Sequence, residues 1–448
     1  MTDRSQHPAR RPRALALAGL ATGLVALAGC TATDDPPAAA PTSPSATATP
    51  TSQSASASVP AAEITPTPRP STFAGAAAIT FPDANVFDGA AADSTVLTMN
   101  GQSLVGRSLP TLETAYTLAP EGGSYADLWV DEQEETGVLL STLSADGAGT
   151  RAGSDAFGLQ EFDVESGEVQ RSTTVEVRKD AAGSARAATA RIAGVAGNVV
   201  VLEARVPDTD TRPAVHAVDL DAGEVAWTER GAGVLAVTDD LVVTTRGDAD
   251  AAGSIDGLAV RSGQRRWRTL ETTGAAALVG VTPTTVAIAR DDPFFGGTST
   301  VRIDLRTGRP GQSVGSIPGT TADGYACQQA GARRAVCSRG DGAVLGIALR
   351  TLEATWRLPG RTRFAPAVSL VEDGLVYGSL DNGVGVVLDA RTGKDLVDLS
   401  GATPTAVNDY GALTIFVGSA VFTPVGEPSP PAPPVSPSAS PSATPTGQ

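Results

Sequence analysis

The chain has 448 residues, of which 41% are hydrophobic and only 4% aromatic, with 49 glycines and 32 prolines. This composition favours one large β-rich body with disordered extensions over several α/β domains. The formal net charge is −16, a sign that repels phosphate backbones, so we expect no binding to nucleic acid.

The first 29 residues have the features of an export signal. Four arginines (Arg4, Arg10, Arg11 and Arg13) precede the apolar run 14–28, which is too short for a comfortable transmembrane helix. The run ends in Leu-Ala-Gly-Cys (27–30), which resembles the bacterial lipobox, where the signal is cut before a cysteine that becomes diacylated. We therefore expect a lipoprotein signal peptide over 1–29 and a lipid on Cys30, which would anchor the protein to the cell membrane, facing outside the cytoplasm. An ordinary secreted protein is the alternative, and export by the Sec or the twin-arginine route stays open.

Two segments of low complexity flank the rest of the chain. Residues 31–72 are nearly all Ala, Thr, Ser and Pro, with no aromatic residue, and residues 426–448 have the same character. Such segments cannot bury enough apolar surface to offset the entropy lost on ordering. We expect a disordered tether over 30–72, a folded part over 73–425 and a disordered tail over 426–448. In an exported protein both segments are candidates for O-linked sugars.

One short hairpin recurs along the folded part. The last copy is LDARTGKDL (388–396), and aligned copies place a turn glycine at Gly167, Gly223, Gly263, Gly308 and Gly393, with Leu112 and Leu352 at the same position in two others. The spacing is 40 to 56 residues, and short alternating apolar segments fill each period. A period near this length indicates a propeller or solenoid, and each period has room for four short strands.

Three features of the repeat have a structural explanation. Glycine at the turn takes positive φ without a Cβ clash, and an aspartate four residues earlier (Asp163, Asp219, Asp304, Asp389) can accept N–H groups of the turn. An aromatic residue follows the turn position by four (Tyr116, Trp227, Trp267, Trp356). A ring of ligand-stacking aromatics is one interpretation. We favour the other, a wedge packed between neighbouring sheets.

The number of blades follows from a count of strands. Plausible strands precede the first hairpin at 76–82, 84–88, 94–99 and 104–109, and others follow the last at 404–409, 412–418 and 420–425. Seven closed blades would leave four strands without a place. We predict an all-β, eight-bladed propeller of four-stranded antiparallel blades, in which 76–82 completes the blade of 404–425; seven blades are the alternative. Closure by both termini also removes exposed sheet edges.

The run VEDGLVYGSLDNGVGVVLDARTGKDLVDL (371–399) resembles the PQQ-type β-propeller repeat, and the resemblance extends more weakly over 73–425. Together with the lipobox, it is similar in architecture to the propeller lipoproteins of the outer-membrane β-barrel assembly machine. The resemblance implies either a non-enzymatic interaction or scaffolding module of the cell envelope or, as the alternative, a PQQ-dependent quinoprotein dehydrogenase.

We expect no enzyme and no cofactor. The dehydrogenases that the resemblance implies clamp PQQ between a disulfide of adjacent cysteines and a flat tryptophan, with a calcium ion beside it. This chain has no adjacent cysteines, and of its four tryptophans only Trp129 lies outside the repeat position. His216 is the only histidine after the signal, and we expect it on the surface. No Cys/His cluster predicts zinc, and the loop 248–256 lacks two ligands of a calcium loop, so we expect no metal.

The longer inter-strand loops, 144–158, 207–214, 248–256 and 291–298, are the predicted working face. Within the last of them, Phe294 and Phe295 are the candidate anchors for a partner, because two exposed aromatics can bury a large area. Their alternative is to fold back over the blade. We expect a monomer that binds unidentified envelope proteins through these loops and contacts the membrane only through its lipid.

Cys327 and Cys337 are the two cysteines besides Cys30. They lie five residues either side of Ala332, so a hairpin that turns there sets them opposite each other, within reach of a disulfide. Because export leads to an oxidising compartment, we predict that they are joined.

Overall fold

In the computed structural model of the chain, the described residues are 78–83, 85–109, 111–131, 135–145, 154–177, 189–205, 213–246, 252–273, 276–292, 297–318, 325–339, 342–399, 403–416 and 418–424. The regular secondary structure of these residues consists of β-strands. None of the described residues forms a helix that is long and apolar enough to cross a membrane. The strands form eight antiparallel sheets of four, and we call these sheets blades.

Seven blades are formed by consecutive strands. Blade 1 has β2 (Asp88–Ala91), β3 (Thr95–Met99), β4 (Leu104–Ser108) and β5 (Thr114–Leu118); blade 2 has β6 (Ser124–Asp131), β7 (Thr136–Ala145), β8 (Ser154–Asp163) and β9 (Val169–Val177); blade 3 has β10 (Thr189–Ala196), β11 (Val199–Arg205), β12 (Ala214–Asp219) and β13 (Glu224–Arg230). Blade 4 has β14 (Gly233–Val237), β15 (Leu241–Arg246), β16 (Ala252–Ala259) and β17 (Arg265–Thr273); blade 5 has β18 (Ala276–Val281), β19 (Thr285–Asp292), β20 (Gly297–Asp304) and β21 (Val314–Pro318). Blade 6 has β22 (Tyr325–Gln329), β23 (Arg334–Arg339), β24 (Val344–Ala348) and β25 (Ala354–Leu358); blade 7 has β26 (Ala367–Glu372), β27 (Leu375–Ser379), β28 (Gly385–Asp389) and β29 (Asp395–Leu399).

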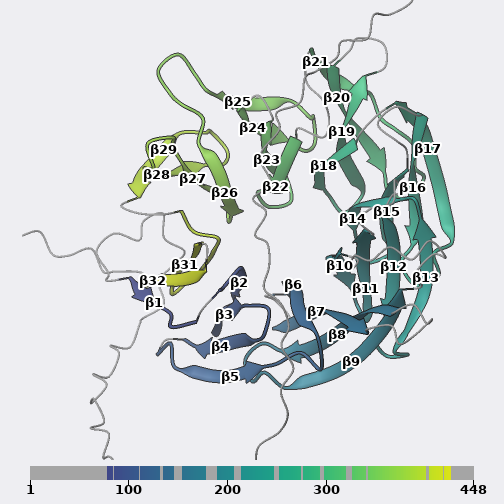
Figure 1. Cartoon of the computed structure of the whole chain (residues 1–448). Helices are drawn as coiled ribbons and strands as arrows, with labels where there is room; N and C mark the ends of the chain where they lie inside the picture. Colours follow the sequence, from purple (N-terminus) through teal and green to yellow (C-terminus); the bar gives the residue numbers. More distant parts are fainter. Residues whose placement is uncertain are drawn as a thin grey trace, which may run out of the picture. The chain divides into compact units, whose positions relative to one another are not determined.

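Blade 8 joins the two ends of the folded part. It has β30 (Ala406–Asn408), β31 (Gly411–Phe416) and β32 (Ser419–Pro424), and the early strand β1 (Ile79–Thr80) completes it by pairing with β32. The first strands of blades 1 to 7 contact one another in succession, and β2 of blade 1 lies against β30 and β31 of blade 8 (Figure 1). The predictions of eight blades and of closure by the N-terminal strand are confirmed.

The core lies between blades, because each strand sends alternate residues to its two neighbours. In β15, Val242 packs with blade 3 while Val243 packs with Val286 and Ile288 of blade 5. All four side chains are at most 1% exposed. Full burial of such a side chain stabilises by about 1.5–3 kcal/mol, so the interfaces between blades hold the ring together.

The repeated aromatic is a wedge between blades, as we favoured. Each ring comes from the last strand of one blade and reaches the turn of the next, where its polar atom donates to a backbone carbonyl: Tyr116 to Val164 (2.6 Å), Trp227 to Val260 (2.5 Å), Trp267 to Leu305 (2.6 Å) and Trp356 to Ala390 (2.8 Å). The same rings lie over the turn glycines Gly167, Gly263, Gly308 and Gly393. A Cβ on Gly308 would lie 2.7 Å from the ring of Trp267, so the aromatic position and the turn glycine depend on each other.

The aspartates of the repeat cap their own turns, as expected. Asp304 accepts a hydrogen bond from the Thr307 N–H at 2.8 Å, and Asp389 accepts one from the Thr392 N–H at 2.7 Å. These hydrogen bonds help to hold the pKa of both carboxyl groups below the usual value.

One predicted strand is displaced. The sequence pattern predicts a strand at 84–88, but β2 covers Asp88–Ala91. The preceding residues instead lie beside blade 8, where the N–H groups of Phe81 and Asn85 donate to Ala420 and Gly418. They connect the two blades that close the ring, a use that alternation of apolar residues does not reveal.

Candidate functional site

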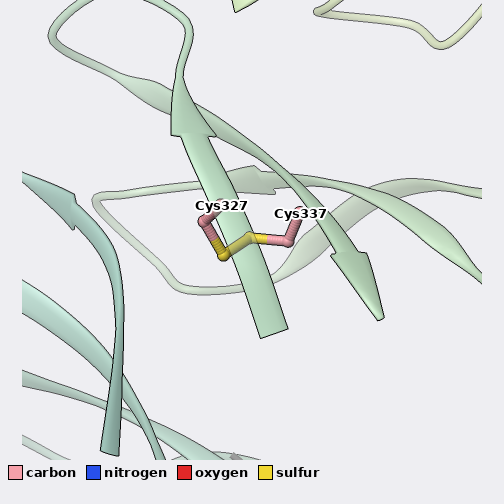
Figure 2. The surroundings of a disulfide bond; sticks show 2 residues. All are labelled: Cys327 and Cys337. Carbon is pink, nitrogen blue, oxygen red and sulfur yellow. A yellow bond between two sulfur atoms is a disulfide. The ribbon is translucent and has the colours of Figure 1, made fainter. Parts of the chain in front are cut away.

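The predicted site residues have different outcomes. Cys30, Phe294 and Phe295 lie outside the described residues. Cys327 in β22 and Cys337 in β23 are paired across the two strands, with their Cα atoms 4.0 Å apart, and a disulfide joins them (Figure 2). The bond fastens the first strand of blade 6 to the second, and Cys337 is fully buried.

His216 is not on the surface, and that expectation is wrong. Its side chain in β12 is 9% exposed, and Nδ1 lies 3.0 Å from the hydroxyl of Thr228 in β13. Burial and the nearby Arg230 lower the pKa of the imidazole. The residue alternation of β12 turns His216 into an interface between blades, so it belongs to the structural interior.

The four long loops share one position in the blade. They connect the second strand to the third in blades 2, 3, 4 and 5, that is β7 to β8, β11 to β12, β15 to β16 and β19 to β20. Consecutive antiparallel strands place these connections at one end of each blade, opposite the tight turns. Residues 146–153, 206–212, 247–251 and 293–296 of these loops lie outside the described residues.

The other end of each blade carries two tight turns side by side, which join the first strand to the second and the third to the fourth. In blades 1 to 7 a backbone N–H after the third strand donates to a carbonyl of the first turn, as from Val260 to Asp240 (3.1 Å) and from Leu305 to Thr284 (2.9 Å). We call this end of the propeller the turn face. This hydrogen bond holds the two turns of a blade side by side, and it recurs in blades 1 to 7.

A groove of about 920 Å³ crosses the turn face over blades 4, 5 and 6. First turns line it on the axial side with Asp239 and Asp240 of blade 4, Thr282, Pro283 and Thr284 of blade 5, and Ala332 of blade 6. Asp304 and Arg306 from the second turn of blade 5, together with Arg266 of β17, line it farther out. The groove therefore has two carboxylates near the ring axis, and two guanidinium groups with the Asp304 carboxylate beside them toward the rim.

Internal hydrogen bonds hold the lining in place. The side chain of Gln329 bridges blades 6 and 5, because its amide accepts from the Val281 N–H (3.0 Å) and donates to the Val281 carbonyl (2.8 Å). The Thr282 hydroxyl accepts from the Thr285 N–H at 3.0 Å. These groups are fixed by the protein itself, whereas Asp240, Arg266 and Arg306 are exposed and turn their charges to solvent.

Two carboxyl groups lie together on the inner strands of blades 1 and 2. Asp88 accepts a hydrogen bond from the Gly89 N–H at 2.8 Å. Asp127 accepts one from the Leu128 N–H at 3.1 Å and another from the Ile192 N–H of blade 3 at 2.6 Å. Burial raises the pKa of both groups, and the charge of Asp127 raises that of Asp88 further. Both side chains cap backbone N–H groups, which gives them a structural role.

The residues present do not match the PQQ site that the resemblance implies. Trp227, Trp267 and Trp356 are engaged between blades, and Trp129 packs against the core of blades 2 and 3. The disulfide joins cysteines ten positions apart rather than adjacent ones. Over the described ranges, no three His, Cys, Asp or Glu side chains gather in a way that could hold a metal ion.

The fold recurs in solved structures at low sequence identity. The computationally designed Ika8 protein matches 78% of this chain and 100% of its own, with 15% identity and a TM-score of 0.52. The quinohemoprotein alcohol dehydrogenase ADHIIG from Pseudomonas putida HK5 matches 78% of this chain and 77% of its own, with 12% identity and a TM-score of 0.50. BamB from Moraxella catarrhalis matches 78% and 98%, with 15% identity and a TM-score of 0.48.

The chain is an eight-bladed β-propeller. This fold agrees with the resemblance of residues 371–399 to the PQQ-type repeat. No protein-family model matches the chain, and no curated protein sequence does. At these identities the likeness extends to the fold, so a function has to be argued from the chain's own residues.

The groove was not predicted from the sequence. The long loops were the predicted working face, because loop length is visible in a sequence and the neighbourhood of separate turns is not. Most residues of the groove belong to tight turns of three blades, and they are spread over 95 positions, from Val237 to Ala332. The available signal was the Arg in the aligned turns, as at Arg306.

Proposed function

We propose that this protein is a lipid-anchored propeller on the outer face of the cell membrane, which binds other envelope proteins through the groove of the turn face and carries out no reaction. The observation that carries the proposal is the groove itself, a preformed hollow across three blades with exposed charges at its rim. A rigid ring on a long tether suits a binding module, because the tether of residues 30–72 would let the propeller reach partners at some distance from the membrane.

The non-enzymatic part of the proposal is supported by the absence of a group for redox chemistry. No protein side chain accepts a hydride, so a propeller dehydrogenase depends on its cofactor. The residues that would clamp PQQ are missing from the sequence or engaged elsewhere, as with Trp267 between blades 4 and 5. The quinoprotein dehydrogenase remains the alternative, and it is tested directly by adding PQQ and Ca²⁺ and measuring binding and dye reduction with alcohols and sugars.

Proximity labelling of the tethered protein tests the main proposal. The full chain, fused at its C-terminus to a labelling enzyme, is compared with Cys30→Ser and with Thr284→Trp, which fills the groove without a change of charge. We expect Cys30→Ser to leave the membrane fraction after a high-salt wash. We expect Thr284→Trp to stay in the membrane but to lose a defined subset of labelled neighbours.

The matched control is Thr111→Trp, which places the same side chain at an exposed turn position of blade 1, outside the groove. An unchanged set of neighbours in Thr284→Trp would contradict a role for the groove. Retention of Cys30→Ser in washed membranes would contradict the lipid anchor. Tight binding of PQQ, or turnover that needs it, would establish the alternative.

A further inference from the structure

The turn face carries two signs of charge in separate sectors. The second turn of a blade joins its third strand to its fourth and contains the repeated turn residue, a Gly or a Leu. The position two residues before the turn residue and the position one residue after it are acidic in blades 2 and 3: Glu165, Glu168, Asp221 and Glu224. The same positions in blades 4 to 7 hold six cations, Arg261, Arg306, Arg309, Arg350, Arg391 and Lys394, and the other two are Gln264 and Glu353. All twelve side chains are exposed. The sign therefore changes between blade 3 and blade 4.

The cations of this arc have no ion pair within the described part of the chain. Ion pairs do form nearby: Arg171 reaches Asp221 at 3.2 Å, and Arg363 pairs with Asp395 at 2.5 Å. By contrast, no described carboxylate lies within 4.0 Å of Arg306 or of the other five cations of the arc. Like charges at neighbouring turns repel each other, and a protein with a net charge of −16 has carboxylates in excess to neutralise them. Asp304 and Asp389 feel the charges of Arg306 and Arg391, which help to lower the pKa of their carboxyl groups, but they form no close ion pair with them. A basic arc without close ion pairs on such a protein indicates an anionic partner.

The groove passes through the basic sector. Arg266 and Arg306 line it toward the rim, and Asp239 and Asp240 line it toward the axis. The outer wall also carries the Asp304 carboxylate, so its two guanidinium groups leave one net positive charge there, against two negative charges on the inner wall. A carboxylate of a ligand is therefore attracted to Arg266 and Arg306 and repelled by the inner wall. The groove is therefore polarised across its width, and a chain lying in it would be oriented by its own acidic side chains.

We propose that the groove and the arc of arginines bind an extended acidic segment of a partner protein. This inference rests on the proposed function and names the chemistry of the partner. An extended chain is narrow enough to follow the second turns of blades 4 to 7 without crossing blades 2 and 3. A flat anionic surface would meet Glu165, Glu168, Asp221 and Glu224 on the same face and be repelled. The two signs thus favour a narrow acidic ligand over a membrane.

Fluorescence anisotropy tests the proposal with the purified full chain and four probes. These are a labelled peptide of alternating Glu and Ser, a Lys/Ser peptide, a Gly/Ser peptide and vesicles of phosphatidylglycerol. We expect the Glu/Ser peptide to bind, with an affinity that falls as salt is added, and the Gly/Ser peptide not to bind. The Lys/Ser peptide is attracted instead to the acidic turns of blades 2 and 3, so Arg306→Glu should not weaken its binding. Arg306→Glu should weaken binding about tenfold, because an attraction is replaced by a repulsion of similar size. Arg306→Lys should restore most of the affinity, and Asp239→Asn should tighten it.

The matched control is Arg361→Glu, an equal change of charge at an exposed residue on the connection between β25 and β26, at the opposite end of the blade. The proposal is overturned if the Glu/Ser peptide binds no better than the Gly/Ser peptide, or if Arg361→Glu weakens binding as much as Arg306→Glu does. Vesicle binding that depends on Arg306 would assign the arc to a lipid surface and overturn it as well. If peptide binding fails while Thr284→Trp still loses its labelled neighbours, the proposed function stands and only the chemistry of the partner is wrong.

Discussion

The exceptions to the repeat show how single residues fit the ring. Leu352 stands at a turn position with a φ of 62°, where a side chain is unfavourable. The preceding blade 5 supplies no aromatic ring there, since Gln312 occupies the position of Trp267 or Trp356. Leu352 is 5% exposed and packs against the core between blades 5 and 6. The leucine therefore fills space that a tryptophan from the preceding blade fills elsewhere.

Gly308→Ala tests this dependence at the residue scale. The new Cβ meets two costs, a φ of +68° and a contact of 2.7 Å with the Trp267 ring, which together should destabilise the fold by about 2–4 kcal/mol. Gly331→Ala is the control, because Gly331 has the same φ of +68° with nothing within 4 Å of the added Cβ. We expect it to cost only about 1–2 kcal/mol. Urea unfolding measures both, and equal losses would show that the Trp267 contact contributes nothing.

At the scale of elements, side chains of one blade cap the first strand of the next. A first strand has a partner on one side only, and its other edge leaves N–H groups to be satisfied. Glu203 of blade 3 accepts from the Val234 N–H (3.0 Å), and Gln328 of blade 6 accepts from the Val371 N–H (2.8 Å). Asp127 caps Ile192 in the same way. These bonds join blades in addition to the apolar contacts.

The two acidic caps should respond to pH in opposite directions. Burial alone would raise the pKa of Glu203, but the Val234 amide, Arg191 and Arg205 hold it below the usual value. Its contribution to stability is present above the unfolded value of about 4.3 and is lost as the pH falls through the folded pKa. Burial raises the pKa of Asp127. The folded protein therefore binds a proton at Asp127 at a higher pH than the unfolded chain does. Its free energy of unfolding consequently rises as the pH falls toward the unfolded pKa of about 3.9.

Urea unfolding of Glu203→Gln and Asp127→Asn over a series of pH values measures these contributions. Glu203→Gln should lose about 2 kcal/mol at neutral pH, with the loss shrinking in acid, because hydrogen bonds to a charged acceptor are the ones removed. As the pH falls, the parent protein gains stability by protonating Asp127. Asp127→Asn should lack this gain. Parallel profiles for the two variants and the parent protein would refute both assignments.

At the scale of the whole molecule, closure of the ring depends on a segment outside the repeat. Phe81 and Asp83 follow β1 and reach Arg107 of blade 1, which is only 4% exposed. The guanidinium of Arg107 pairs with Asp83 at 2.7 Å and lies 4.3 Å from the centre of the Phe81 ring. One buried cation thus binds the segment that joins blade 8 to blade 1.

Asp83→Ala should weaken this closure. Removal of one partner leaves the Arg107 charge buried without its carboxylate, a change that costs about 3–5 kcal/mol in buried pairs. Asp395→Ala is the control, because the pair of Asp395 with Arg363 is 56% and 34% exposed and its loss should cost no more than about 1 kcal/mol. Thermal unfolding and protease cleavage before residue 88 report the two effects. Equal stability of the two variants would show that the Arg107 pair does not hold the ring closed.

The sequence by itself determined the architecture, because the signals of a propeller are local and repeated. Asp389, Gly393 and the aromatic position recur at a fixed offset, and each acts over one hairpin or between adjacent blades. Counting strands was enough to predict eight blades and their closure. The pattern failed where a residue serves a contact outside the repeat, as at residues 84–88, and where both faces of a strand are buried between blades, as at His216.

Only the tertiary structure decided which residues share a surface. Asp239, Thr284 and Ala332 belong to turns of three different blades, and they line one groove because the blades stand side by side in the ring. The change of sign from Glu224 to Arg261 was present in the aligned repeats. It matters for binding because the fold places all of these turns on one face. Charges act through space over about 10 Å, so their effect depends on the position of each blade and not on the distance along the chain.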